Sequence, residues 1–133
     1  MTAIQVRPAT LADLASVAAL FDSYRQFYEQ PPALEAATRF IRARMENHES
    51  TILVAEDTTA TATTSGPLGF CQLYPSFCSV EMVPIFVLYD LFVTPAARGA
   101  GAGKALLLAA HDHAATQGAK RLDLTTAKTN HTA

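Results

Sequence analysis

A strand, a glycine-rich turn and a helix follow one another between Ile85 and Lys104, and no other stretch constrains the fold as much. The apolar run from Ile85 to Val93, rich in β-branched and aromatic residues, is typical of a buried strand. Pro95 ends the strand because it has no N–H for the ladder. Three glycines then precede good helix formers that begin at Ala105. This order predicts free backbone N–H groups at a helix N-terminus, which is a binding site for phosphate.

Two well-known glycine loops do not fit this turn. The P-loop needs a glycine where Arg98 stands and Ser or Thr where Ala105 stands. The dinucleotide fingerprint places its third glycine on Lys104 or Leu106, and it tolerates neither residue there. The spacing that fits is Arg-x-x-Gly-x-Gly, from Arg98 to Gly103.

This motif resembles the acetyl-CoA-binding motif of the GCN5-related N-acetyltransferases (GNAT), and the segment from Asp90 to Arg98 is similar to the end of that family's fourth strand. The resemblance covers nearly the whole chain. It implies an acetyl-CoA-dependent N-acetyltransferase that transfers the acetyl group directly to a primary amine of a small molecule or peptide. The alternative is a non-catalytic acyl-CoA-binding or scaffold protein. A structural turn with accidental glycines is the reading that assigns no function, and the strand before the motif and the helix after it count against that reading.

Composition predicts one folded domain over residues 1–133. Half of the residues are hydrophobic and 17% are charged, which is typical of a globular chain. A net charge of −2 without a basic block gives no support for nucleic-acid binding. We find no membrane-spanning run and no signal peptide, so we expect a cytoplasmic protein. Cys71 and Cys78 match no zinc or redox spacing, and we expect no metal.

Hydrophobic periodicity predicts the order β-α-α-β-β-β-α-β, an α+β fold with a mixed, mostly antiparallel sheet, which the resemblance also implies. The predicted strands are 4–7, 51–56, 68–74, 85–93 and 120–125, and the predicted helices are about 11–28, from about 33 to 46, and about 102–117. Thr10 and Asp13 resemble a capping box. We expect a turn at Pro75 and Ser76, and a helix C-cap at Gly118.

The resemblance implies that the pyrophosphate lies on the N–H groups of the turn and that the pantetheine arm pairs with the edge of the preceding strand. A Cβ at Gly101 or Gly103 would crowd the phosphate or demand an unfavourable φ. Arg98 adds charge, or is a solvated turn residue. The implied cofactor-binding residues are Leu91, Phe92, Val93, Arg98, Gly99, Ala100, Gly101, Ala102, Gly103, Lys104 and Asn130.

A carboxylate near the end of this strand is the expected catalytic base. Asp90 is the first candidate, because burial in an apolar strand raises a carboxyl pKa toward a useful value. An Asp that faces the polar side of the sheet or caps a backbone group is the structural alternative. Glu81 is the second candidate. Tyr89 alternates with Asp90, so we expect their side chains on opposite faces.

By analogy with the family, the acceptor wall uses the first predicted helix and the strands beside it. An acid and aromatic rings there suit a cationic amine. The candidates are Tyr24, Tyr28, Glu29, Gln72, Tyr74, Phe77 and Tyr89, of which Tyr24 could equally be core. His111 and His113 are two apart and face different ways on a helix, so we expect both on the surface and neither in a metal site.

After the last predicted strand, Thr126, Asn130 and Ala133 follow the family's pattern, and the sequence then ends. The family's usual proton-donating tyrosine and its last helix and strands lie beyond this point. We therefore expect a truncated domain whose last strand has one open edge. Such an edge predicts a homodimer or poor solubility.

Overall fold

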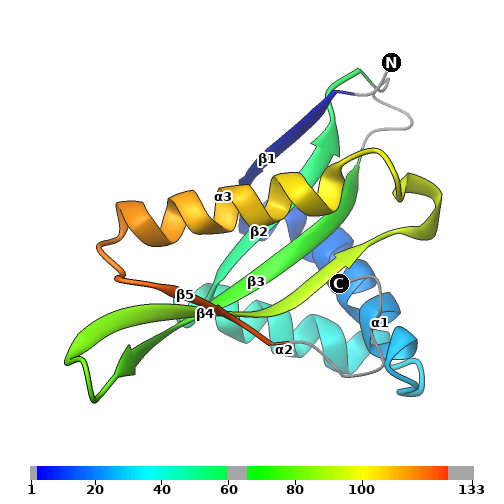
Figure 1. Ribbon diagram of the computed structural model, residues 1–133. Coiled ribbons are helices and arrows are strands. Elements are labelled where there is room, and N and C mark those ends of the chain that lie inside the picture. The colour runs from blue at the N-terminus through cyan, green and yellow to red at the C-terminus, as the bar shows by residue number, and fades with distance from the viewer. Residues whose placement is uncertain (1–2, 60–65, 126–133) are drawn as a thin grey trace.

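The computed structural model describes residues 3–59 and 66–125 of the chain (Figure 1). The elements are β1 (Ile4–Pro8), the 3-10 turn η1 (Leu11–Asp13), α1 (Leu14–Phe27), α2 (Leu34–Glu46), β2 (Thr51–Asp57), β3 (Pro67–Cys78), β4 (Val83–Val93), the 3-10 turn η2 (Pro95–Ala97), α3 (Ala102–Thr116) and β5 (Leu122–Leu124). The predicted order of strands and helices is confirmed. Within the described ranges, no helix is both long and apolar enough to cross a membrane.

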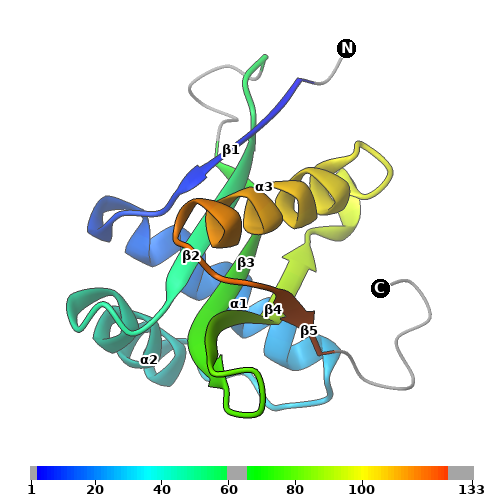
Figure 2. The ribbon, with the colours of Figure 1, turned by 60° about the vertical axis from the view of Figure 1, so that its left-hand side comes forward.

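The strands form one sheet whose order follows the chain, β1-β2-β3-β4-β5. Every pairing up to β4 is antiparallel, whereas β4 and β5 run parallel, because α3 carries the chain back between them. Figure 2 shows α3 across one face of the sheet and α1 and α2 on the other. The predicted α+β fold with a mixed, mostly antiparallel sheet is confirmed. The homodimer expected from an open strand edge stays a prediction.

Two apolar cores fill the space between the sheet and its helices. Successive side chains of a strand point to opposite faces. Ile52 and Val54 of β2 therefore pack with α1 and α2, while Leu53 and Ala55 pack beneath α3. Phe70 of β3 belongs to the first core. Because side chains alternate along β3 in the same way, every second residue counted from Phe70 points to the α1 face.

The predicted turn at Pro75 and Ser76 is wrong. β3 continues to Cys78 and pairs Pro75 with Phe86 of β4, and the chain reverses only at Ser79–Met82, where the Met82 N–H donates to the Ser79 carbonyl (3.1 Å). β2 pairs with β3 only as far as Leu73, so Pro75 lies where β3 has one free edge. Sheets tolerate proline in that position.

The predicted surface position of His113 holds only in part, because its side chain is half-buried. Its Nε2 lies 3.1 Å from the Thr51 hydroxyl, and its ring packs edge-on against Phe86 with the centroids 5.5 Å apart. Burial lowers the pKa of His113. His111 is exposed, as predicted. Gln117 is the C-cap of α3, and Gly118, predicted as the C-cap, follows it with a φ of +82°.

Arg7 joins the first strand to the first helical turn. Its guanidinium donates two hydrogen bonds to the Asp13 carboxylate, both 2.8 Å, and two to the Glu56 carboxylate, at 2.7 and 3.3 Å. The Thr10 N–H also donates to the Asp13 carboxylate (2.8 Å), which is the predicted capping contact. Hydrogen bonds from Arg7 lower the pKa of Asp13 to about 2.

We therefore expect Asp13→Asn to destabilise the fold in a pH-dependent way. A carboxylate whose folded pKa is depressed adds stability above its unfolded pKa of about 4 and loses that contribution as the pH falls toward 2. The Arg7 side chain is 35% exposed, so solvent screening reduces the effect; we expect a loss of about 1–2 kcal/mol at pH 7. Urea unfolding at pH 7 and pH 2 measures it.

Asp112→Asn is the matched control, because the Asp112 side chain is 83% exposed on α3. It should leave the unfolding midpoint unchanged at both pH values. An equal loss for Asp13→Asn at pH 7 and pH 2 would show that the ion pair with Arg7 is not the source of the stability.

Candidate functional site

A β-bulge interrupts the pairing of β3 with β4. Gln72 pairs with Asp90 and Leu73 pairs with Leu88, which leaves Tyr89 as the extra residue of β4. An extra residue breaks the strict alternation of side chains. Tyr89 packs edge-on against Tyr74 of β3, with the ring centroids 5.5 Å apart, while Asp90 lies beside Gln72.

Tyr74 and Gln72 are two residues apart on β3 and point to the same face. Tyr89 and Asp90 therefore share the α1 face, and the prediction that they lie on opposite faces is wrong. The prediction failed because it assumed regular alternation through a bulged position.

β4 and β5 pair over three residues and then separate. The register joins Phe86 to Leu122 and Leu88 to Leu124, and the last bond runs from the Thr125 N–H to the Leu88 carbonyl (3.2 Å). Among the described residues, the edge of β4 from Leu91 onward has no neighbouring strand on that side. The parting of the two strands opens the sheet next to the bulge.

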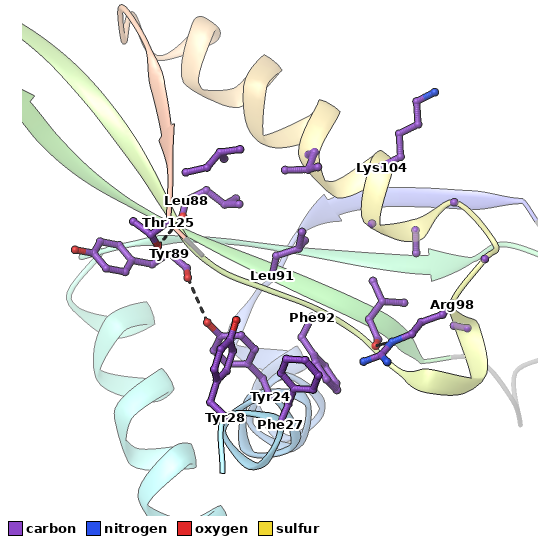
Figure 3. Close-up of a pocket in the computed structure, with 18 residues that line it drawn as sticks. Tyr24, Phe27, Tyr28, Leu88, Tyr89, Leu91, Phe92, Arg98, Lys104 and Thr125 are labelled. Atoms are coloured by element: carbon purple, nitrogen blue, oxygen red, sulfur yellow. Dashed lines mark hydrogen bonds between the residues drawn. The ribbon is translucent and has the colours of Figure 1, made fainter. Parts of the chain in front are cut away.

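A cavity of about 770 Å³ occupies this opening, between the end of α1, the edge of β4 and the start of α3 (Figure 3). Most of the predicted cofactor-binding residues line it. These are Leu91, Phe92, Val93, Arg98, Gly99, Gly101, Ala102, Gly103 and Lys104, together with the predicted acceptor residues Tyr24, Tyr28 and Tyr89. Ala100 does not line the cavity, and Asn130 lies outside the described residues.

Several residues of the cavity wall were not predicted from the sequence. They are Phe27, Leu88, Ala97, Leu107, Leu124 and Thr125. Phe27 could have been found, since it lies one helical turn after Tyr24 and shares its face. Whether Leu124 and Thr125 line the cavity depends on where β5 separates from β4, and no local sequence pattern predicts that position.

The glycine turn uses its glycines for different physical reasons. Gly99 and Gly101 both have φ of +88°, a left-handed conformation that other residues adopt only at a cost. Gly101 is the N-cap of α3, whose first bond joins the Ala105 N–H to the Gly101 carbonyl (3.0 Å). The amide groups from Ala102 to Lys104 precede that bond and have no helical acceptor.

Gly103 has an ordinary helical backbone. A Cβ built there would meet only a Val93 methyl group, at 3.9 Å. The fold itself thus has room for a side chain at Gly103, and the missing methyl leaves space at the cavity wall beside free N–H groups. Of the two reasons predicted for a glycine at position 103, an unfavourable φ does not apply, and crowding of a bound phosphate stays a prediction.

Arg98 ties the glycine turn to α1. Its Nε donates to the Val93 carbonyl (3.2 Å), and its guanidinium lies 5.9 Å from the Phe27 ring and 5.8 Å from the Phe92 ring. Such distances are at the outer limit of cation–π contacts. Lys104 extends from the first turn of α3 (Figure 3), so this end of the cavity carries positive charge.

Asp90 lies beneath the bulge in a chain of polar groups. The Gln72 Nε2 donates to the Asp90 carboxylate (2.8 Å), and the Ser50 hydroxyl donates to the Gln72 Oε1 (2.7 Å). Gln72 is fully buried, and no buried side-chain polar atom of the described residues lacks a partner. Burial raises the pKa of Asp90, against the opposing effect of hydrogen bonds from Gln72 and Tyr24.

The other predicted acid does not reach the cavity. Glu81 lies in the turn between β3 and β4, where its exposed carboxylate accepts a hydrogen bond from Arg121 (2.6 Å). Glu29 follows the end of α1, exposed, with a φ of +64°. Tyr74 and Gln72 stand behind Tyr89 and Asp90 and not in the cavity wall, and Phe77 is exposed on the arm that β3 and β4 form.

Comparisons with known proteins place the chain in a family. The model of the acetyltransferase (GNAT) family matches residues 16–133. The uncharacterized N-acetyltransferase YhfO of Bacillus subtilis (strain 168) is 49% identical over 124 residues, which is 92% of this chain and 78% of YhfO. A probable acetyltransferase from Haemophilus influenzae (strain ATCC 51907 / DSM 11121 / KW20 / Rd) is 32% identical over 70% of this chain and 60% of its own length.

A solved structure of similar shape leads to the same family. The crystal structure of a probable acetyltransferase superposes with a TM-score of 0.86 at 33% identity, covering 96% of this chain and 82% of that one. The strand, glycine turn and helix that first suggested the resemblance lie within the matched region. The chain belongs to the GNAT acetyltransferase family and is an N-acetyltransferase.

Proposed function

We propose that this N-acetyltransferase uses acetyl-CoA and transfers the acetyl group directly to a primary amine of a small molecule or peptide. One observation carries the proposal: a single cavity runs from the free amide groups of the α3 N-terminus to the aromatic wall of α1, past the point where β4 and β5 separate. Donor and acceptor can therefore meet in one space.

The residues of the turn suit the phosphates of coenzyme A. The amide groups from Ala102 to Lys104 and the positive end of the helix dipole favour an anion, and Arg98 and Lys104 add charge. The room that Gly103 leaves supports a close approach of phosphate to these amide groups. The unpaired edge of β4 from Leu91 to Val93 offers backbone groups to the pantetheine arm. Acetyl-CoA supplies the activated acetyl thioester.

The other end of the cavity suits an amine. Tyr24, Phe27 and Tyr28 of α1 present ring faces and phenol groups, and aromatic faces attract ammonium groups. An amine must lose a proton before its nitrogen can attack a carbonyl carbon, and the Asp90 carboxylate interacts with Tyr24 of this wall. Its raised pKa brings it closer to the working range of a general base. No motif on this wall selects one acceptor.

Calorimetric titration with acetyl-CoA, followed by thiol release across a panel of primary amines and N-terminal peptides, tests the proposal. Saturable binding with amine-dependent thiol release supports it. Binding without release for any amine would favour an acyl-CoA-binding protein, and no binding by folded protein would contradict the proposed role of the turn.

We expect Gly103→Ala to weaken acetyl-CoA binding without destabilising the fold. The new methyl group finds room in the free protein, but it covers the amide groups that a phosphate would approach. Losing hydrogen bonds to a charged group costs on the order of 1.5–3 kcal/mol, which raises the Kd roughly tenfold or more. Calorimetry measures the affinity and thermal melting the stability.

Gly101→Ala and Gly118→Ala are the comparison variants for Gly103→Ala. Each places a Cβ at a positive φ, +88° and +82°, so each should cost about 1–2 kcal/mol of stability. Gly118 lies at the far end of α3, outside the cavity wall, and its variant should retain affinity for acetyl-CoA. If Gly103→Ala binds acetyl-CoA as the unmodified chain does, phosphate does not approach that position.

We expect Asp90→Asn to lower kcat by about 10²–10⁴-fold, which is the usual range for loss of a general base. The amide keeps an oxygen that can accept the Gln72 hydrogen bond, so the fold should persist. In the unmodified chain, kcat should rise with pH as Asp90 ionises, with a midpoint above the ordinary Asp pKa. This rise of kcat with pH should be absent in Asp90→Asn.

Glu81→Gln is the matched control, since Glu81 is an exposed carboxylate outside the cavity. Its pH profile and kcat should equal those of the unmodified chain. A normal profile for Asp90→Asn would instead exclude Asp90 as the base.

A further inference from the structure

We propose that Tyr24 is a catalytic residue that relays the proton of the acceptor amine to Asp90. This inference rests on the proposed function, in which Asp90 accepts that proton. It assigns a role to a tyrosine of α1, whereas the sequence pattern left Tyr24 between acceptor wall and core.

Tyr24 reaches the cavity and Asp90 does not. Tyr24 is one of the residues that line the cavity, while Asp90 lies behind the wall, beneath the bulge of β4. Figure 3 shows the Tyr24 side chain extending from α1 toward the backbone of Tyr89. A base behind the wall needs a group that meets both the base and the amine. Tyr24 lines the cavity, and its hydroxyl interacts with Asp90.

The hydroxyl of Tyr24 lies beside two acceptors. It donates to the Tyr89 carbonyl at 3.3 Å, and Asp90, the next residue of β4, has a carboxylate whose pKa is lowered by interaction with the same hydroxyl. A phenol has a single hydrogen to donate, and its oxygen keeps lone pairs that can accept from a third group. An amine N–H in the cavity would be such a group.

Aromatic packing holds the Tyr24 ring in place. The ring packs edge-on against Phe70 and Phe92, with centroids 5.9 and 6.2 Å away, and against Tyr28 at 5.2 Å. Phe70 is fully buried and Phe92 nearly so. A ring fixed on three sides keeps its hydroxyl at the carboxylate, which proton transfer requires.

The groups around Asp90 favour transfer from a neutral hydroxyl. Tyr24 and Tyr28 lie on the α1 side, and Gln72 and Tyr74 lie on β3. Asp90 forms no ion pair with any described residue. No neighbouring cation therefore neutralises the carboxylate, and it keeps its affinity for a proton. Burial and the Asp90 charge raise the pKa of Tyr24, which keeps its hydroxyl protonated and able to donate.

The relay balances as two coupled transfers. One N–H bond of the ammonium breaks and its proton forms an O–H bond on Tyr24, while the original Tyr24 proton passes to an oxygen of Asp90. The nitrogen keeps the electron pair and becomes a nucleophile. Tyr24 ends as it began, Asp90 becomes a neutral acid, and its proton later returns to solvent.

Tyr24→Phe tests the relay, because it removes the hydroxyl and keeps the ring packing. We expect kcat for the best alkylamine of the panel to fall on the order of 100-fold, with the Kd for acetyl-CoA unchanged. With the matching alkoxyamine, whose nitrogen is mostly neutral at pH 7, the fall should shrink to a few-fold. An equal fall for both amines would overturn the relay.

A double variant separates a relay from a structural role. If Tyr24 acts only through Asp90, Tyr24→Phe combined with Asp90→Asn should lose little more kcat than Asp90→Asn alone, because both changes break the same path. Multiplicative losses would mean that the two side chains act independently, and the relay would be wrong.

A third measurement needs no acceptor and keeps the two proposals distinguishable. The Asp90 carboxyl carbon is titrated by NMR in the unmodified chain and in Tyr24→Phe. Since the Tyr24 hydrogen bond lowers the pKa of Asp90, its loss should raise that pKa. An unmoved titration overturns the relay, whereas a panel in which no amine releases thiol overturns the proposed function.

Discussion

The bulge at Tyr89 is the feature on which the rest of the site depends. Without the extra residue, regular alternation would turn Asp90 to the α3 face, into the core that Leu88 and Leu91 share. With it, Asp90 lies on the α1 face beside Gln72, and the Tyr89 carbonyl meets the Tyr24 hydroxyl. One inserted residue therefore brings a carboxylate, a phenol and a backbone acceptor together where the sheet opens.

The parts of the site that sequence could predict are those that local chemistry decides. Pro95, the glycines and the helix formers after them specify a strand, a turn and a helix within twenty residues, and the structure has them where expected. The amphipathic helices and the strand order followed from periodicity in the same way. Asp90 could be predicted as a candidate site residue because a charged side chain in an apolar strand costs free energy, which indicates a specific role.

The parts that sequence could not predict depend on pairing between distant strands. The bulge exists because β3 and β4 shift register between Gln72 and Leu73, and neither strand alone carries a sign of it. For the same reason Pro75 looked like a turn: only the end of the β2 pairing makes its position a tolerant edge. Glu81 was a candidate base because its position in the fold was not known from the sequence. In the structure it lies in the turn at the end of the arm that β3 and β4 form, where it pairs with Arg121.

Asp90 is largely withdrawn from solvent, and no cation of the described residues pairs with it. That arrangement is informative because a charge costs free energy when it leaves water unpaired. A structural carboxylate in such a place is usually matched by Arg or Lys, as Asp13 is matched by Arg7. Asp90 has instead an amide donor from Gln72 and the Tyr24 hydroxyl beside it, both neutral. Neutral donors hold the carboxylate in position while leaving its affinity for a proton high. A group that must take up a proton and give it back in every turnover needs that combination, and an ion pair would remove it.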